Sequence, residues 1–217
     1  MAPQLEVTIM KWLLFTLTFL FLTEYRSEDM IIQMKTEQML YTSVGIRTNN
    51  GSGSGVIIAS GEGVTLVLTA KHVIKNAKKP RIRVYPDETE YKATVIRRSN
   101  KYDLAILAFE GNHPFVAKLT DDLNIQVFEK IYKMGAGGGV EDPYPGEGII
   151  TGIDEDSMQI NCGVVMGDSG GPLFKKDGDD YVLVGIITMV GMLQMGAPIY
   201  HVGLAHNVIA IMDFLSE

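Results

Sequence analysis

The stretch GDSGGPL, residues 167–173, places a serine among glycines directly before an apolar run. Because glycine has no Cβ, its backbone can approach a ligand closely, and the N–H groups around Ser169 can converge beside its hydroxyl. Converging N–H groups stabilise an oxyanion. A serine hydroxyl also needs a base, and a group that orients the base, before it acts as a nucleophile. This stretch therefore predicts a nucleophile turn whose two partners lie elsewhere in the chain.

Two upstream motifs supply these partners. His72 ends the motif TAKH, at the end of a strand-like run, and Asp103 opens the motif DLAIL, just before another. A neutral imidazole, with an ordinary pKa of about 6.5, can accept the serine proton near neutral pH. A carboxylate on its other nitrogen fixes the tautomer. All three residues fall at predicted strand ends, so the sequence predicts a Ser–His–Asp hydrolase.

Composition narrows the alternatives. The chain has 217 residues, of which 46% are apolar and 21% charged, enough for a real core. Its net charge of −7 and the lack of a long Lys/Arg stripe argue against a nucleic-acid partner. The single cysteine, Cys162, excludes an intramolecular disulfide and is interpreted as a small apolar residue near the site. No metal or organic cofactor is expected, because no His, Cys and Asp cluster has ligand spacing.

An uncharged apolar run, Trp12–Leu22, follows Lys11 near the N-terminus. The run is shorter than the roughly 20 residues of a membrane-spanning helix, so the core of a signal peptide fits better. An Ala-x-Ala cleavage signature is missing, which leaves an uncleaved membrane anchor open. The acidic residues after the run predict that the body of the chain is secreted or extracytoplasmic. Residues 1–35 are thus predicted to be a signal peptide or membrane anchor with a linker.

Short β-rich runs separated by turn residues fill the remaining chain. Their even spacing predicts an all-β fold of two six-stranded antiparallel β-barrels, with the active site between them and a C-terminal helix over 206–215. The N-terminal barrel, 36–120, would carry His72 and Asp103, and the C-terminal barrel, 121–217, would carry Ser169. The predicted strands are 42–48, 55–60, 64–69, 81–85, 91–98 and 104–109, then 126–133, 148–154, 158–160, 172–175, 181–188 and 199–205.

The three motifs, in this order, resemble those of the chymotrypsin-fold (trypsin-like) serine proteases. GSGSGVII at 51–58 and GLA at 203–205 are similar to the disulfide-free bacterial HtrA/DegP-like and glutamyl-endopeptidase-like members. Only 12 residues follow Ala205, so no PDZ domain is expected. The resemblance implies that Ser169 is the nucleophile, His72 the general base and then acid, and Asp103 the orienting carboxylate. It also implies an oxyanion hole made by the N–H groups of Gly167 and Ser169.

Substrate preference follows from the same resemblance. The S1 pocket would be lined by the segment before the serine, including Gly163, and by Thr188, Met189 and Val190. No acid stands at Gly163, and Val190 stands where a glycine usually leaves the pocket open. We therefore expect a shallow apolar pocket for a small or aliphatic P1 residue, the residue before the cleaved bond. No Ile-Val-Gly-Gly-like start is found, so Asp168 is expected to bond local backbone.

Two other functions share some features of this sequence. A catalytically silent or latent binding module of the same fold would usually lack one of the three residues, and none is lacking. An α/β-hydrolase esterase would need a helix after its G-x-S-x-G motif. Here PLF, residues 172–174, follows and predicts a strand. The sequence therefore favours a serine endopeptidase that acts on proteins or peptides.

Overall fold

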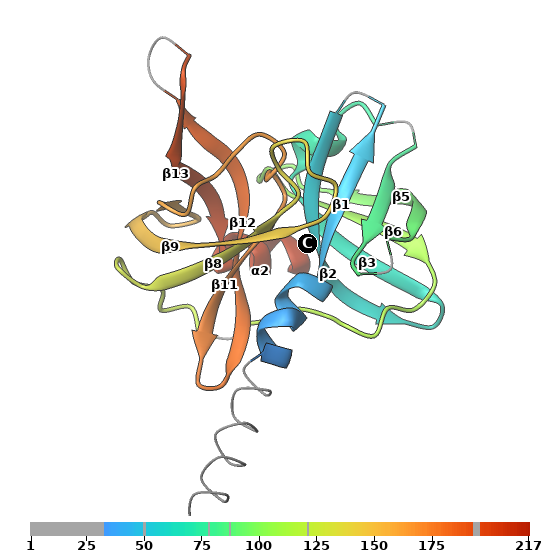
Figure 1. The fold of residues 1–217 in the computed structure, drawn as a ribbon, viewed down its shortest axis with the longest axis horizontal. Helices are drawn as coiled ribbons and strands as arrows, with labels where there is room; N and C mark the ends of the chain where they lie inside the picture. The colour runs from blue at the N-terminus through green and yellow to red at the C-terminus, as the bar shows by residue number, and fades with distance from the viewer. Residues whose placement is uncertain (1–32, 50, 78, 87, 121, 193–195) are drawn as a thin grey trace, which may run out of the picture. The chain divides into compact units, whose positions relative to one another are not determined.

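The computed structural model describes residues 33–217 except 50, 78, 87, 121 and 193–195 (Figure 1). Residues 38–217 form one compact unit, to which the following description refers. Residues 33–37, in the preceding unit, are helical. The run Trp12–Leu22 lies outside the described residues, so its role as signal peptide or anchor stays a prediction. Among the residues described, no helix is long and apolar enough to cross a lipid bilayer.

The first half of the unit is a closed barrel with the strand order β1-β2-β3-β6-β5-β4, every neighbouring pair antiparallel. Alternating apolar residues point inward, as in β1, where Val44 and Ile46 are buried among the side chains of Ile57, Val67 and Leu107. The strands are β1 (Ser43–Thr48), β2 (Gly51–Gly61), β3 (Val64–Thr69), β4 (Arg81–Val84), β5 (Glu90–Arg98) and β6 (Ala105–Glu110).

The second half is also a six-stranded antiparallel barrel, with the order β11-β8-β9-β10-β13-β12 closed by pairing of β11 with β12. The strands are β8 (Lys130–Gly135), β9 (Tyr144–Ile153), β10 (Ser157–Ile160), β11 (Pro172–Asp177), β12 (Asp180–Met192) and β13 (Pro198–Asn207). One unpredicted strand, β7 (Lys118–Leu119), adds to β12 in parallel. The prediction of two six-stranded antiparallel barrels is confirmed, and Figure 1 shows them side by side. The domain boundary at residue 120 stays a prediction.

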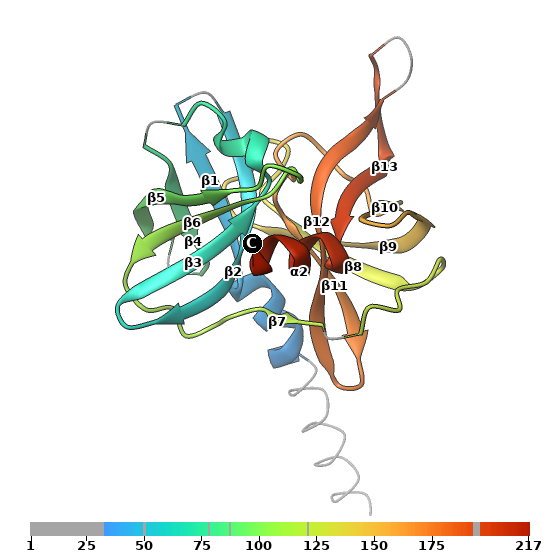
Figure 2. The same cartoon turned by 180° about the vertical axis from the view of Figure 1, so that it is seen from behind.

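The C-terminal helix α2 (Val208–Ser216) closes the fold. It begins two residues later than predicted, because Asn207 caps it: the Asn207 carboxamide oxygen accepts hydrogen bonds from the N–H groups of Ile209 and Ala210. Ile211 and Phe214 on its apolar face join a core cluster with side chains from both barrels. The helix thus packs against both halves, as Figure 2 shows from behind.

The barrels also meet backbone to backbone beside Ser169. The N–H of Ser54, in β2, donates to the carbonyl oxygen of Ser169 at 2.8 Å. Gly170 follows with a φ of +86°, and a Cβ there would collide with the Ser54 carbonyl and the Thr69 hydroxyl. Only glycine meets both demands. This contact fixes Ser169 of the second barrel against the first.

Candidate active site

Ser169 lies in a tight turn between β10 and β11, named here the Ser169 turn (residues 165–171). The N–H of Asp168 donates to the carbonyl of Val165 at 3.1 Å, and the N–H of Gly171 donates to the carbonyl of Asp168 at 2.8 Å. Gly167 has a φ of +101°, a conformation that favours glycine. These features are the physical reason for the glycines in the motif. They present the Ser169 hydroxyl at the junction of the barrels.

The N–H groups of Gly167 and Ser169 are available to a ligand. The Met166 carbonyl accepts a hydrogen bond from the N–H of Gly138 at 2.8 Å. Because a trans peptide holds its C=O and N–H in opposite directions, the N–H of Gly167 points away from Gly138. Within the part of the chain that the structure describes, neither the Gly167 nor the Ser169 N–H has a hydrogen-bond partner. The turn therefore offers two free N–H donors, one on the residue before Asp168 and one on the residue after it.

His72 and Asp103 form a close pair at one end of the first barrel. His72 lies in the short 3-10 helix η1 (Lys71–Ile74), and its Nδ1 lies 2.6 Å from Asp103 Oδ2. The His72 backbone N–H donates to Oδ1 of the same carboxylate at 2.9 Å. Burial raises the pKa of Asp103, but hydrogen bonds and charge from His72 outweigh it, and the net pKa lies below its ordinary value. An ionised Asp103 favours the proton on Nδ1, which leaves Nε2 of His72 to accept one.

A second histidine supports Asp103 from the other barrel. The backbone N–H of Asp103 donates to Nε2 of His206, in β13, at 3.0 Å. Nε2 must therefore be unprotonated, and Nδ1 carries the proton toward the Asp156 carbonyl at 3.2 Å. Sequence reasoning missed His206, because no motif surrounds it. The only available signal was its position at the end of a predicted strand.

Replacing His206 with alanine should lower the rate of covalent labelling of Ser169 by a fluorophosphonate about 5- to 10-fold, the worth of one lost hydrogen bond. His206→Gln should keep most of the rate, because its amide oxygen can still accept the Asp103 N–H. Labelling rates of the three proteins, measured together with their thermal midpoints, check this. An alanine variant that labels at the wild-type rate would contradict a positioning role.

One cavity of about 730 Å³ joins these elements. Seven of the eight predicted site residues line it: His72, Asp103, Gly167, Ser169, Thr188, Met189 and Val190. Gly163 does not belong to the lining. It is exposed with a φ of +64°, and its place in a substrate pocket stays a prediction.

The cavity residues do not all bond to one another. The Ser169 hydroxyl donates to the Thr188 carbonyl at 3.4 Å, a long and weak contact. No hydrogen bond between Ser169 and His72 occurs among the described residues. Catalytic hydrogen bonds are often long in proteins without substrate and tighten when it binds. The structure therefore brings the three predicted catalytic residues to one cavity and pairs two of them.

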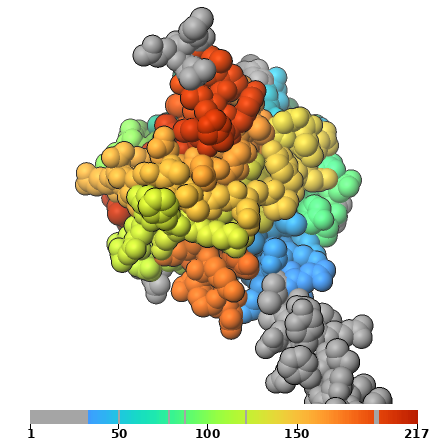
Figure 3. Space-filling view, turned by 60° about the vertical axis from the view of Figure 1, so that its left-hand side comes forward, coloured from blue at the N-terminus to red at the C-terminus, as the bar shows by residue number. Residues whose placement is uncertain are grey.

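Methionines that the sequence analysis did not single out complete the lining. Met166 is 71% exposed and Met192 57% exposed, and both face the same cavity as Met189. Thioether side chains are flexible and polarisable, so they adapt to varied apolar groups. Met189 and Met192 belong to the end of β12 that Figure 3 shows standing out from the second barrel with β13. This wall of the cavity is apolar and adjustable.

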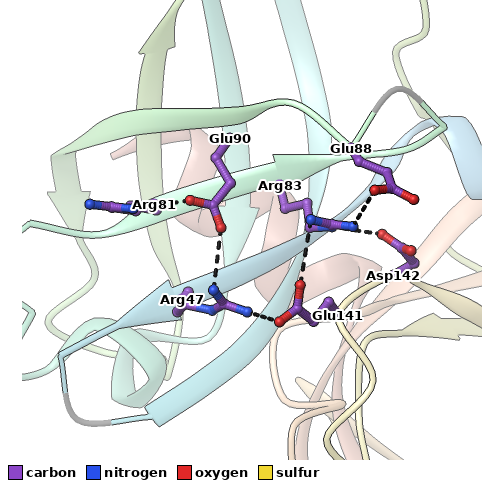
Figure 4. Close-up of polar contacts among 7 residues, drawn as sticks. All are labelled: Arg47, Arg81, Arg83, Glu88, Glu90, Glu141 and Asp142. Carbon is purple, nitrogen blue, oxygen red and sulfur yellow. Dashed lines mark hydrogen bonds and ion pairs between the residues drawn. The ribbon is translucent and has the colours of Figure 1, made fainter.

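The loop 136–143 holds the Ser169 turn from the outside. The Ser54 hydroxyl donates to the Gly167 carbonyl and accepts from the Ala136 N–H, both at 2.8 Å. Farther along, Glu141 and Asp142 form ion pairs with the first barrel through Arg47 and Arg83 (Figure 4). Figure 4 shows the whole network, which comprises Arg47, Arg81, Arg83, Glu88, Glu90, Glu141 and Asp142. The loop thus joins the turn to both barrels.

Cys162 is buried near the second barrel's core. Burial is the main cause that raises the pKa of its thiol, to about 11. A thiol in that state is a poor nucleophile at neutral pH. This agrees with its interpretation as a small apolar residue.

Known proteins with similar sequences are serine proteases. Residues 53–186 match the family model described as a trypsin-like peptidase domain. The "Serine protease Do-like HtrA" of Bacillus subtilis strain 168 is 29% identical over 157 residues, which cover 65% of this chain and 34% of the relative. A "Probable periplasmic serine endoprotease DegP-like" of Pseudomonas putida strain GB-1 is 30% identical over 146 residues, 64% of this chain and 29% of the relative. The chain thus spans about a third of the length of these relatives.

Solved structures share the fold. The serine endoprotease from Yersinia pestis superposes with a TM-score of 0.72 at 19% identity, over 85% of this chain and 65% of that one. The protein Rv3671c from Mycobacterium tuberculosis H37Rv, in the inactive form of a serine-to-alanine mutant, gives a TM-score of 0.67 at 21% identity. That match covers 86% of this chain and 88% of the other.

Two antiparallel barrels with a histidine–aspartate pair and a serine turn between them define the chymotrypsin-like class of protein. The match over residues 53–186 then shows that the chain belongs to the trypsin-like peptidase domain family. The predicted resemblance to trypsin-like and HtrA/DegP-like serine proteases is confirmed.

Proposed function

We propose that this chain is a serine endopeptidase that hydrolyses peptide bonds through an acyl-enzyme intermediate. The observation that carries the proposal is the cavity in which the His72–Asp103 pair and Ser169 lie together, beside two N–H donors that have no hydrogen-bond partner among the described residues. An imidazole held by a carboxylate is a base for serine, and free N–H donors suit an oxyanion. Each residue that acyl transfer needs is therefore present in one space.

In the proposed reaction, Ser169 Oγ attacks the carbonyl carbon of the substrate while Nε2 of His72 accepts the hydroxyl proton. The N–H groups of Gly167 and Ser169 stabilise the oxyanion of the tetrahedral intermediate. His72 then gives its proton to the leaving amine as the C–N bond breaks. Water, deprotonated by His72, then attacks the carbonyl carbon of the acyl-enzyme. The bond from this carbon to Ser169 Oγ breaks as His72 returns the proton to Oγ, and the acid is released.

Before attack, the Ser169 hydroxyl must turn from the Thr188 carbonyl toward His72. The 3.4 Å contact with Thr188 is weak, so little free energy opposes a rotation about the serine side-chain bond. The carbonyl of Ser169 is held by the N–H of Ser54 at 2.8 Å, which restrains the backbone beside the nucleophile. The proposed reaction therefore includes a rotation of the Ser169 side chain that forms the bond to His72.

Covalent labelling tests the proposed function directly. The full chain is treated with a fluorophosphonate probe, and the modified peptide is located by mass spectrometry, with Ser169→Ala as the matched control. We expect one adduct, on Ser169, and none on the variant. A folded wild-type protein that takes no label would contradict an activated serine.

Absence of label would instead favour a second candidate, a latent or silent binding module of the same fold. The observation in its favour is the lack of a Ser169–His72 hydrogen bond among the described residues. Labelling that begins only after addition of a protein or peptide would identify a latent peptidase, because binding would then complete the triad.

Proteins or peptides outside the cytoplasm are the proposed substrates. The names of the DegP-like relatives place those proteins in the periplasm. The acidic flank of the Trp12–Leu22 run supports the same side of the membrane for this chain. Residues 1–35 would then act as a signal peptide or anchor. The proposed catalytic unit has His72 and Asp103 in 36–120 and Ser169 in 121–217.

Cleavage of a peptide library should favour small or aliphatic P1 residues over Lys and Arg by at least about tenfold, because an apolar pocket leaves a buried cation unpaired. Val190 is nearly buried beside Thr188 and Met189, and no acidic residue lines the cavity apart from Asp103, among the described residues. Val190→Gly should shift the profile toward larger apolar P1 residues. A preference for Lys or Arg in the wild type would disprove this pocket.

A further inference from the structure

A buried ion pair lies directly behind the Ser169 turn, and the proposed reaction does not use it. Asp168 is fully buried, and the side chain of Lys133 is only 2% exposed. Lys133 Nζ lies 2.5 Å from Asp168 Oδ2. Removing two charges from water costs several kcal/mol for each ion. A buried ion pair is therefore expected only where it holds a required conformation or where further hydrogen bonds satisfy both ions.

Lys133 is held firmly in place. It lies on β8, between Leu173 on β11 and Gly146 on β9. Its ammonium group lies 4.4 Å from the ring centroid of Tyr144 and 3.4 Å from the Tyr144 hydroxyl. A Cβ on Gly146 would press on the lysine stem. The cation therefore has a fixed position, set by three strands of the second barrel.

Asp168 is the residue between the two free N–H donors. Its Oδ2, besides facing Lys133, accepts the backbone N–H of Val165 at 2.9 Å. One carboxylate oxygen thus ties the start of the Ser169 turn to the lysine on β8. The bond to local backbone was expected from the sequence, because no Ile-Val-Gly-Gly-like start was found, but Lys133 was not identified there as a partner of Asp168.

The opposite side of the carboxylate is closed by backbone. A Cβ on Gly135 or Gly137 would collide with Asp168 Oδ1. That oxygen has no hydrogen-bond partner among the described residues. The pairing with Lys133 and the bond from Val165 therefore decide where the carboxylate lies. With the carboxylate in place, Gly167 and Ser169, whose N–H groups are the proposed oxyanion donors, line the cavity on either side of Asp168.

We propose that Lys133 is a positioning residue that holds the oxyanion-binding form of the Ser169 turn through Asp168. This inference rests on the proposed function and adds the group that prepares it. Because the cation comes from a strand of the same barrel, the turn needs no cation from outside the barrel to take this form.

The test compares four full-length variants by their kinetics of fluorophosphonate labelling, separated into the binding constant KI and the maximal rate kinact. Lys133→Met keeps the length of the side chain and removes its charge. Lys133→Met combined with Asp168→Asn removes both charges, so the pair leaves no buried charge behind. Lys175→Met is the matched control. Lys175 is also a nearly buried lysine with acidic partners, Asp122 and Glu129, but it lies outside the cavity. Ser169→Ala sets the background.

We expect Lys133→Met to lower kinact about 100-fold, as loss of an oxyanion donor does, while KI changes less than about threefold. The double variant should recover the thermal midpoint but keep kinact at least about tenfold low, because only the neutral bond to Val165 remains. Lys175→Met should lose thermal stability and keep the wild-type kinact.

A folded double variant with the wild-type kinact would overturn the inference. If Lys133→Met alone fails to fold, the kinact of the double variant is the deciding measurement. A fall in kinact for Lys175→Met equal to that of Lys133→Met would also overturn it, because any buried lysine would then have the same effect. Failure of the proposed function is recognised separately: the Ser169→Ala protein would label as fast as the wild type.

Discussion

Replacing Ser169 with alanine is expected to lower kcat for peptide hydrolysis by about a million-fold, and His72→Ala by a similar factor. The two residues act as one unit, because attack on the substrate requires transfer of the Ser169 hydroxyl proton to His72. The double variant should therefore be no slower than either single variant. Steady-state cleavage of a peptide chosen from the library profile, measured at high enzyme concentration, gives the three values.

Matched controls separate this loss from damage to the fold. Ser216→Ala and His113→Ala change the same residue types outside the cavity, and both should keep wild-type kcat. His113 contacts the Phe115 carbonyl, so its variant also reports a small stability change. Losses of the two single variants that multiply in the double variant would contradict a shared reaction step.

Asp103→Asn carries the second-largest expected effect, a fall in kcat of about 10,000-fold with KM nearly unchanged. The amide is almost the same shape as the carboxylate, but its NH₂ group can face Nδ1 of His72 and hold the proton on Nε2 instead. The nitrogen that must accept the serine proton is then already protonated. Measurement of kcat and KM on the same peptide, beside a thermal melt, distinguishes the wrong tautomer from unfolding.

The pH dependence of stability gives an independent check on Asp103. Its pKa is lower in the folded chain than its ordinary value, so the ionised carboxylate stabilises the fold. That stabilisation is complete above the ordinary aspartate pKa of about 4 and is lost as the pH falls through the lowered pKa. The Asp103→Asn variant should therefore lose less stability than the wild type between neutral and acidic pH. An equal loss in both proteins would argue against an ionised Asp103.

Local signals predicted most strands of this fold. Runs of β-forming residues bounded by turn residues placed β3 and β5 within a residue of their ends. The strand prediction was wrong where pairing with a distant strand sets the bounds of an element. β2 begins at Gly51, inside a predicted loop, because β1 offers its backbone for pairing there. β7 is too short to give any pattern. It pairs with Val182 and Leu183 of β12, which lie before Gly185, where the pairing of β12 with β13 begins.

The residues of the candidate site show the same difference between local signals and distant contacts. His72, Asp103 and Ser169 were found because each lies in a motif whose spacing is local. Lys133 and His206 were not, since each acts through a partner far away in the sequence, Asp168 and Asp103 respectively. Residue type gives no signal for a buried lysine, because lysines are mostly exposed. Only the closed barrel turns its side chain inward.

The backbone contact beside Ser169 has a consequence for how such a chain can evolve. The halves are joined there through the N–H of Ser54 and the carbonyl of Ser169, and Gly170 leaves no space for a side chain. A main-chain joint does not depend on which residues fill the two cores. Substitutions in either core can therefore leave this contact between His72's barrel and Ser169's barrel unchanged, whereas a single methyl group at position 170 would force the two backbones apart.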